Sequence, residues 1–443
     1  MKLERVRPIA DAVLYEGYIL YPYRSSATKN RSRWSFGGIF PQLWSEATAG
    51  AEPGQLATEF LVQGDEAARI ECCLRFLQPL AREVGVIEPP LVAWPADAEP
   101  AFCAVSLLDI DERHYCSWQE AIERELLFEP QALGGLAQQP VALEFTYPAQ
   151  RSLEPLTDRE GLIRGLLLRR QCAQHGRVHL TAAPVAAGVW RVAACIENHT
   201  SMVPAQILHR EEASLYSFAS SHLVFGIDSG AFVSRQDPQA EFAQSSAACV
   251  DRGLFPILAG DPGTHDLLLA APIILYDHPE VAPESPGELY DATEVDELLS
   301  LTIRALTDEE KREMVAADPR AAALLARTEA LSGEDMLRLH GRLRAAPPDS
   351  APLLVVLERA GRRLNVGDRV RLNPRPRGDV LDLVLAEKTA VIEAIERDFD
   401  DRVHVAVTLD DDPGREWGLE RMPGHRFFFA PEEIEPFERS AHA

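Results

Sequence analysis

The chain has 443 residues, of which 46% are hydrophobic and 26% charged, and its 44 Lys+Arg against 69 Asp+Glu give a formal charge of −25. This composition is typical of a globular protein and excludes wholesale disorder, and the acidic balance excludes general nucleic-acid binding, which needs a basic surface. No run of about 18 apolar residues is present, and residues 1–5 do not begin a secretory signal. We therefore expect a cytoplasmic protein without membrane insertion, whose seven scattered cysteines are reduced thiols.

Residues 1–140 are predicted as a mixed α/β region. β-favouring residues are dense at 13–21 and again at 55–62, which indicates two strands. Asp65 is a suitable N-cap and apolar residues follow it at helical spacing, so a helix is predicted over 65–82. Ser117 and Glu120 have the spacing of a capping box, which predicts a second helix over 118–127.

Residues 141–275 are predicted as a β-rich, sandwich-like region. Hydrophobic residues alternate with a period of two at 141–147, 163–171, 178–182 and 189–197. Short loops between such segments are typical of an antiparallel meander or sandwich. One helix is expected near the end of this region, at 238–250.

Residues 276–346 begin as an acidic, proline-rich loop and continue as a helical segment, with a capping box at Thr307 and Glu310 and a further N-cap at Ser332. After a second proline-rich stretch, an SH3-like barrel is predicted over 362–438, with a turn followed by a strand at 366–372 and further strands at 389–396, 402–409 and 426–429. The predicted fold class is therefore α+β, with a β-rich N-terminal region, a helical segment and a C-terminal SH3-like β-barrel.

Four strings in the chain resemble a family of uncharacterised proteins that are encoded in bacterial gene clusters for nickel–iron hydrogenases. They are YEGYILYPYR at 15–24, APESPG at 282–287, TDEEKREM at 307–314 and VHVAVTLDDDP at 403–413. The resemblance extends from the first predicted strand into the predicted barrel. It implies an accessory or assembly factor for these hydrogenases, on the ground of gene neighbourhood, and it supplies no catalytic or ligand residues.

One candidate metal site follows from residue spacing. Cys195, Glu197 and His199 alternate along a predicted strand, so their side chains share one face. A thiolate, a carboxylate and an imidazole together suit nickel, iron or zinc. The alternative is that residues 197–200 close the strand in a turn, where Asn198 and Thr200 hydrogen-bond the backbone.

A second candidate lies in the acidic, proline-rich loop. Asp277, His278 and Glu280 place carboxylates beside an imidazole, which can bind a metal or act as acid and base. The alternative is a solvated loop whose prolines fix its path. Together with Glu284, the acids of this loop are also candidates for contact with a basic partner.

The basic loop at 24–33 stands out in a strongly negative chain. Arg24, Lys29, Arg31 and Arg33 could hold a phosphate, a carboxylate or an acidic segment of a partner protein. Alternatively, these cations pair with the chain's own acids, for example those at 277–297.

We predict a non-enzymatic accessory protein without a cofactor, acting through protein partners, with hydrogenase subunits and other maturation factors as the candidates that the resemblance implies. The alternative is a metal-dependent enzyme or a carrier of nickel, iron or zinc, with ligands around Cys195 and His199 or at 277–280. A third hypothesis is a structural subunit that stays in the mature complex.

Overall fold

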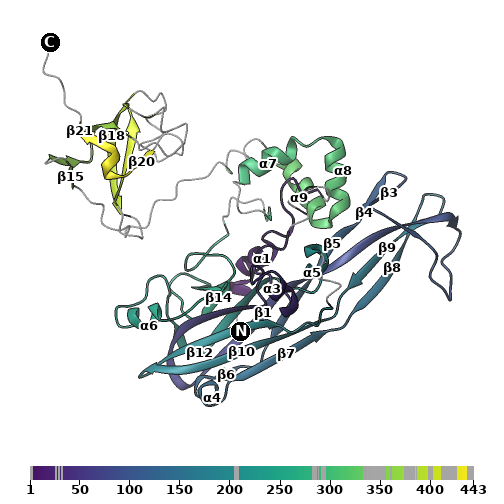
Figure 1. Cartoon of the computed structure of the whole chain (residues 1–443), viewed down its shortest axis with the longest axis horizontal. Coiled ribbons are helices and arrows are strands. Elements are labelled where there is room, and N and C mark those ends of the chain that lie inside the picture. The colour runs from purple at the N-terminus through teal and green to yellow at the C-terminus, as the bar shows by residue number, and fades with distance from the viewer. Residues whose placement is uncertain are drawn as a thin grey trace, which may run out of the picture. The chain divides into compact units, whose positions relative to one another are not determined.

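We describe the protein from a computed structural model. The structure describes residues 3–24, 27, 30, 33–203, 209–281, 287, 289–290, 296–332, 335, 339, 356–359, 362–373, 385, 387–397, 403–410 and 427–436. It divides the chain into two compact units, residues 1–341 and 342–443. The first combines a large antiparallel sheet with helices, so the prediction of a β-rich α+β fold is confirmed (Figure 1). Within the described ranges, no helix is long and apolar enough to cross a membrane.

One strand of 37 residues, β1 (Gln55–Leu91), is the spine of the first unit. It belongs to a 12-stranded sheet. The first part of β1 pairs with β11 (Val189–Asn198) and β12 (Ala219–Phe232), and the last part pairs with β5 (Trp118–Leu127) and β9 (Ile163–Gln171). One sheet therefore contains strands from both regions predicted at 1–140 and 141–275.

The other strands of this sheet extend it on both sides of the spine. The strands predicted at 141–147, 163–171, 178–182 and 189–197 are confirmed as β7, β9, β10 and β11. Besides β1, β5, β9, β11 and β12, the sheet contains β2 (Cys103–Val105), β6 (Gln131–Ala132), β7 (Val141–Tyr147), β8 (Gln150–Thr157), β10 (Gln174–Ala186), β13 (Phe255–Leu258) and β14 (Leu267–Ala271). A separate hairpin is formed by β3 (Leu107–Ile110) and β4 (Arg113–Cys116).

The helices predicted at 65–82 and 118–127 are wrong. Both segments are strands, and they pair with each other, from Cys73 opposite Leu127 to Arg82 opposite Trp118. Every residue from 72 to 80 is buried. A strand that is buried on both faces has a nearly continuous apolar run, and periodicity alone cannot distinguish such a run from a buried helix.

The strand predicted at 13–21 is wrong as well, because the chain there begins with a helix, α1 (Arg7–Tyr15). Ala10, Val13 and Leu14 bury its apolar face, and it ends before Gly17, whose φ of 72° does not continue a helix. The helix predicted at 238–250 is limited to α6 (Ala243–Ala247). Other short helices are η1 (Leu3–Arg5), α3 (Gln42–Ala47), α4 (Leu133–Gln138) and α5 (Arg210–Ser214).

The main core lies against β1 and is rich in aromatic rings. Phe60 packs on Phe225 with ring centroids 4.8 Å apart, and Phe76 packs on Phe218 at 4.9 Å. All four side chains are fully buried. Aromatic pairs at this separation are stabilising beyond the area that they bury, so they hold the spine against the strands around it.

Three helices follow the sheet: α7 (Asp296–Arg304), α8 (Asp308–Ala317) and α9 (Pro319–Ala330) (Figure 1). The predicted capping box is confirmed, since Thr307 Oγ1 accepts a hydrogen bond from Glu310 N and Glu310 Oε2 accepts one from Thr307 N. Tyr18 donates a buried hydrogen bond of 2.6 Å to Asp318, the N-cap of α9. These helices therefore share a core with the N-terminal segment.

The second unit contains a five-stranded antiparallel sheet in the order β20-β19-β18-β17-β21. Its strands are β17 (Arg369–Leu372), β18 (Thr389–Arg397), β19 (Val403–Leu409), β20 (Phe427–Phe429) and β21 (Ile434–Pro436), and β15 (Val356–Arg359) pairs with β16 (Arg362–Asn365) apart from it. The short helix η3 (Pro431–Glu433) precedes β21. The four predicted strands are confirmed. In the described residues, however, β20 and β21 form the two edges of the sheet and do not pair with each other, so the sheet is not a closed barrel.

Candidate functional site

The structure describes two of the four basic residues that were predicted to contact a partner. Arg24 Nη1 lies 2.9 Å from Glu310 Oε1, so this arginine pairs with an acid of the chain itself, in α8 and not at 277–297. Arg33 is only 2% exposed. Lys29 and Arg31 lie outside the described residues.

Arg33 is enclosed by aromatic rings. Its guanidinium carbon lies 3.8 Å from the ring centroid of Trp118, 4.4 Å from that of Trp34 and 5.4 Å from that of Tyr18. Its Nη1 donates a hydrogen bond of 2.8 Å to Tyr18 O. Burial lowers the pKa of Arg33 to about 10, so the guanidinium is still charged at neutral pH. The rings stabilise this charge through cation–π attraction.

Two buried donors in this cluster have no acceptor. Arg33 Nη2 and Trp118 Nε1 make no hydrogen bond within the part of the chain that the structure describes. Trp118 is 8% exposed, so neither group is well hydrated. A buried donor without an acceptor costs roughly 1–3 kcal/mol, and more when it is charged. Such a cost is commonly retained where a ligand supplies the missing acceptor.

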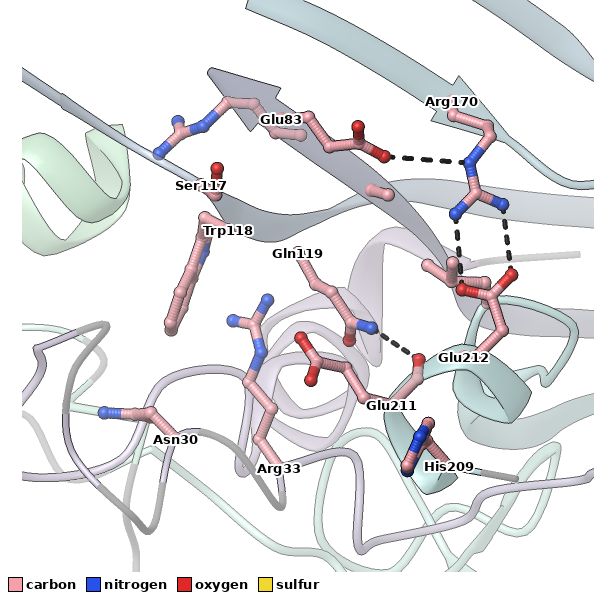
Figure 2. A pocket seen from close by; sticks show the side chains of 13 residues that line it. Asn30, Arg33, Glu83, Ser117, Trp118, Gln119, Arg170, His209, Glu211 and Glu212 are labelled. Atoms are coloured by element: carbon pink, nitrogen blue, oxygen red, sulfur yellow. Dashed lines mark hydrogen bonds and ion pairs between the residues drawn. The ribbon is translucent and has the colours of Figure 1, made fainter. Parts of the chain in front are cut away.

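Arg33 and Trp118, the residues that carry these donors, line a pocket of about 530 Å³, which we call the Arg33 pocket. Its walls come from Arg82 and Glu83 of β1, Gln119 of β5, Arg170 of β9 and the helix α5. Figure 2 shows the Arg33 side chain pointing toward Trp118 and Gln119. The volume lies within the range of roughly 300–1,000 Å³ that small-molecule sites occupy.

The other arginines of the Arg33 pocket are already paired. Arg170 reaches both carboxylate oxygens of Glu212, at 3.2 and 3.3 Å, and lies 4.0 Å from Glu83 (Figure 2). Arg82 forms an ion pair of 3.0 Å with Glu120. Arg33 has no such direct ion pair among the described residues, although the charges of Asp318 and Glu211 act on it from farther away. Its Nη2 is therefore still able to donate to a bound acceptor.

Gln119 fixes the walls around Arg33. Its Oε1 accepts a hydrogen bond of 2.7 Å from Trp34 Nε1, and its Nε2 donates to Glu211 O, also at 2.7 Å, and to Ser214 Oγ at 3.1 Å. One side chain of β5 thus holds both the aromatic neighbour of Arg33 and the helix α5. These contacts shape the wall of the pocket beside Arg33.

Of the three residues in the first predicted metal site, Glu197 and His199 are hydrogen-bonded to each other, whereas Cys195 has another partner. Glu197 Oε2 lies 2.9 Å from His199 Nε2, and also 3.1 Å from Nε2 of His179, which the sequence analysis missed. Cys195 instead points to Gln55 Oε1 at 3.8 Å. Within the described residues, no set of three or more histidines, cysteines and acids is placed to hold a metal ion.

The protonation states of this cluster follow from burial and charge. Burial raises the pKa of Glu197, but the hydrogen bonds and charges of His199 and His179 outweigh it and leave the pKa below its usual value. Burial, helped by the charge of Glu197, raises the pKa of Cys195 to about 11. The thiol therefore stays protonated at neutral pH, where it is a weak ligand.

Hydrogen bonds to Ser234, Leu258 and Gly260 hold the second candidate loop in place. Asp277 accepts hydrogen bonds from Leu258 N at 2.8 Å and from Ser234 Oγ at 2.5 Å, so this carboxylate anchors the loop. His278 Nδ1 lies 3.3 Å from Gly260 O. Glu280 is exposed, and Glu284 lies outside the described residues. The structure does not bring Asp277, His278 and Glu280 together on one ligand position.

No protein-family model matches this sequence, and no curated protein matches it either.

Proposed function

We propose that the chain is a non-enzymatic accessory factor for the assembly of nickel–iron hydrogenases, and that it acts through protein–protein contacts. The resemblance of the four strings supports the hydrogenase context. A binding role is supported by one observation above all: Arg33 lines a pocket, is buried, and among the described residues has no acceptor for its Nη2. A preformed site of this kind loses little conformational entropy when it binds.

The proposal is tested by capturing partners from the native host with the tagged full-length chain and identifying them by mass spectrometry. We expect hydrogenase subunits in the wild-type eluate and about tenfold less of them with Arg33→Gln, because truncation of a buried anchor removes most of the affinity of a contact. The control is Arg164→Gln, which changes an arginine of β9 that pairs with Asp158 outside the pocket. Wild-type eluates without hydrogenase subunits would refute the proposal.

Two further measurements separate the remaining hypotheses about the complex. A deletion strain is expected to lose hydrogenase processing and activity, and normal processing in that strain would count against any assembly role. Stoichiometric presence of the chain in the purified mature hydrogenase would identify it as a structural subunit. A transient factor leaves the complex and is captured only with immature subunits.

The second candidate function, a metal carrier or metal enzyme, is favoured by the two imidazoles that share Glu197 Oε2. We expect the purified chain to contain less than stoichiometric nickel, iron and zinc by elemental analysis, because the Cys195 thiol is protonated and directed away from Glu197. One equivalent of metal in the wild type, lost in Glu197→Gln but kept in Glu144→Gln on the neighbouring strand β7, would overturn that expectation and establish the carrier.

A further inference from the structure

We propose that the Arg33 pocket binds a carboxylate group, which accepts one hydrogen bond from Arg33 Nη2 and one from Trp118 Nε1. The proposal rests on the proposed function for the source of this group, a peptide segment of the partner that ends in or carries a carboxylate. The chemistry of the ligand follows from the pocket itself.

The number of missing acceptors matches a carboxylate. Two donors of the Arg33 pocket lack a partner among the described residues, and both belong to one stacked pair, since the guanidinium carbon of Arg33 lies 3.8 Å from the Trp118 ring centroid. A carboxylate offers two oxygens in a plane, so a single group can supply both acceptors. A water molecule could supply acceptors as well, but, unlike a carboxylate, it would form no ion pair with the Arg33 guanidinium.

Charge favours an anion with a single negative charge. Arg33 is charged and, among the described residues, has no ion-pair partner, whereas Arg82 and Arg170 are neutralised by Glu120 and Glu212. Glu83 and Glu211 also line the pocket, and the charges of Asp318 and Glu211 already act on Arg33, so the site tolerates little further negative charge. A phosphate carries up to two negative charges and would be repelled by the carboxylates that line the pocket, including Glu83 and Glu212.

The aromatic surroundings strengthen this contact. Tyr18, Trp34 and Trp118 surround the guanidinium of Arg33 and keep water away from it. Only 2% of the Arg33 residue is exposed. Charge-assisted hydrogen bonds between arginine and carboxylate are stronger in such a low-dielectric site than in water. The rings also offer apolar surface to the carbon atoms that carry the carboxylate.

The test follows the indole N–H signals of the six tryptophans in ¹H–¹⁵N spectra of the full-length chain. The probes are the peptide acetyl-Ala-Ala-Leu with a free C-terminus, the same peptide as its C-terminal amide, sodium succinate and sodium phosphate, at constant ionic strength. We expect the free-acid peptide to move the Trp118 signal downfield in a saturable way. The amide is expected to bind about tenfold more weakly, because it lacks the charge.

The outcomes distinguish a peptide from a small organic acid as the source of the carboxylate. They also test the carboxylate site independently of the proposed hydrogenase function. Succinate binding more tightly than the peptide supports the carboxylate site and assigns it to a small organic acid. No saturable shift with either the peptide or succinate, or phosphate binding as tightly as they do, overturns the proposal. Because the titration uses only purified protein, it can succeed when the capture of hydrogenase subunits fails, and the reverse.

Two variants make the test specific. Arg33→Gln is expected to abolish saturable binding. Trp118→Phe keeps an aromatic ring over the guanidinium and removes only the Nε1 donor, so it is expected to weaken binding by about fivefold to tenfold. In that variant the Trp34 indole, whose ring lies 4.4 Å from Arg33, reports binding. The matched control is Trp190→Phe, since Trp190 donates to Gly64 O elsewhere in the sheet and its loss should leave the affinity unchanged.

Discussion

Replacing Arg82 with methionine is expected to lower the free energy of unfolding of the first unit by about 3 kcal/mol. The Arg82 side chain is 8% exposed and joins three parts of the fold. It pairs with Glu120 of β5, donates to Cys116 O and donates to the carbonyls of Ala316 and Ala317 at the end of α8. Methionine keeps much of the aliphatic stem but removes the donor to the carbonyls of Cys116, Ala316 and Ala317, which is the larger part of the cost.

The measurement is urea unfolding followed by tryptophan fluorescence, combined with hydrogen exchange over residues 308–330. Faster exchange there is expected, because Arg82 is one of the groups that hold α8 to the sheet. The matched control is Arg169→Met, which removes a second cation from the same Glu120 but from a side chain that is 31% exposed. That change is expected to cost no more than about 1 kcal/mol. Equal effects of the two substitutions would contradict the argument.

The stability of the first unit is expected to fall in acid because of His222. This side chain is fully buried, and burial lowers its pKa from 6.5 to about 3, although its hydrogen bond to Ser220 O acts in the opposite direction. The unfolded chain therefore binds a proton below pH 6.5 that the folded chain does not. Stability that is fully present above pH 6.5 is lost as the pH falls toward 3, by about 1.4 kcal/mol per pH unit.

The substitution His222→Asn isolates this contribution. Asparagine has an amide N–H that can take the place of the Nδ1–H donor toward Ser220 O, but it does not titrate. We expect the variant to be less stable at pH 7, because its smaller side chain leaves a cavity. Between pH 6.5 and 4.5, however, its free energy of unfolding should fall by about 2 kcal/mol less than that of the wild type. The free energy of unfolding of both proteins is measured by urea unfolding at each pH. If it falls equally in the two proteins, His222 is not responsible for the loss of stability in acid.

Local signals in the sequence were sufficient for parts of the fold. The capping box at Thr307 predicts the start of α8, and a period of two predicts β7, β10 and β11, because these strands alternate between more buried and more exposed residues. The strand β9 was predicted in the same way, although its residues 165–168 are all buried. The strands of the second unit were also predicted from local sequence alone. In each case the information lies within a few neighbouring residues.

The same reasoning failed for the spine of the sheet. The segment 65–82 of β1 and the segment 118–127 each carry helix signals, and each becomes a strand by pairing with the other. A strand satisfies its backbone through a partner that lies far away in the chain, so its stability is not a property of the segment alone. No local rule contains the register that places Arg82 opposite Trp118.

For the candidate sites, the sequence by itself singled out the basic loop at 24–33, which includes Arg33, through charge contrast, and it grouped Cys195, Glu197 and His199 through spacing. Only the tertiary structure decided that Arg33 is enclosed by Trp118 and that His179 joins Glu197. The physical reasons differ. His179 and Glu197 lie on the paired strands β10 and β11, where register decides which side chains meet. Arg33 lies outside any strand, and it contacts Trp118 of β5 only because the chain folds this segment against the sheet.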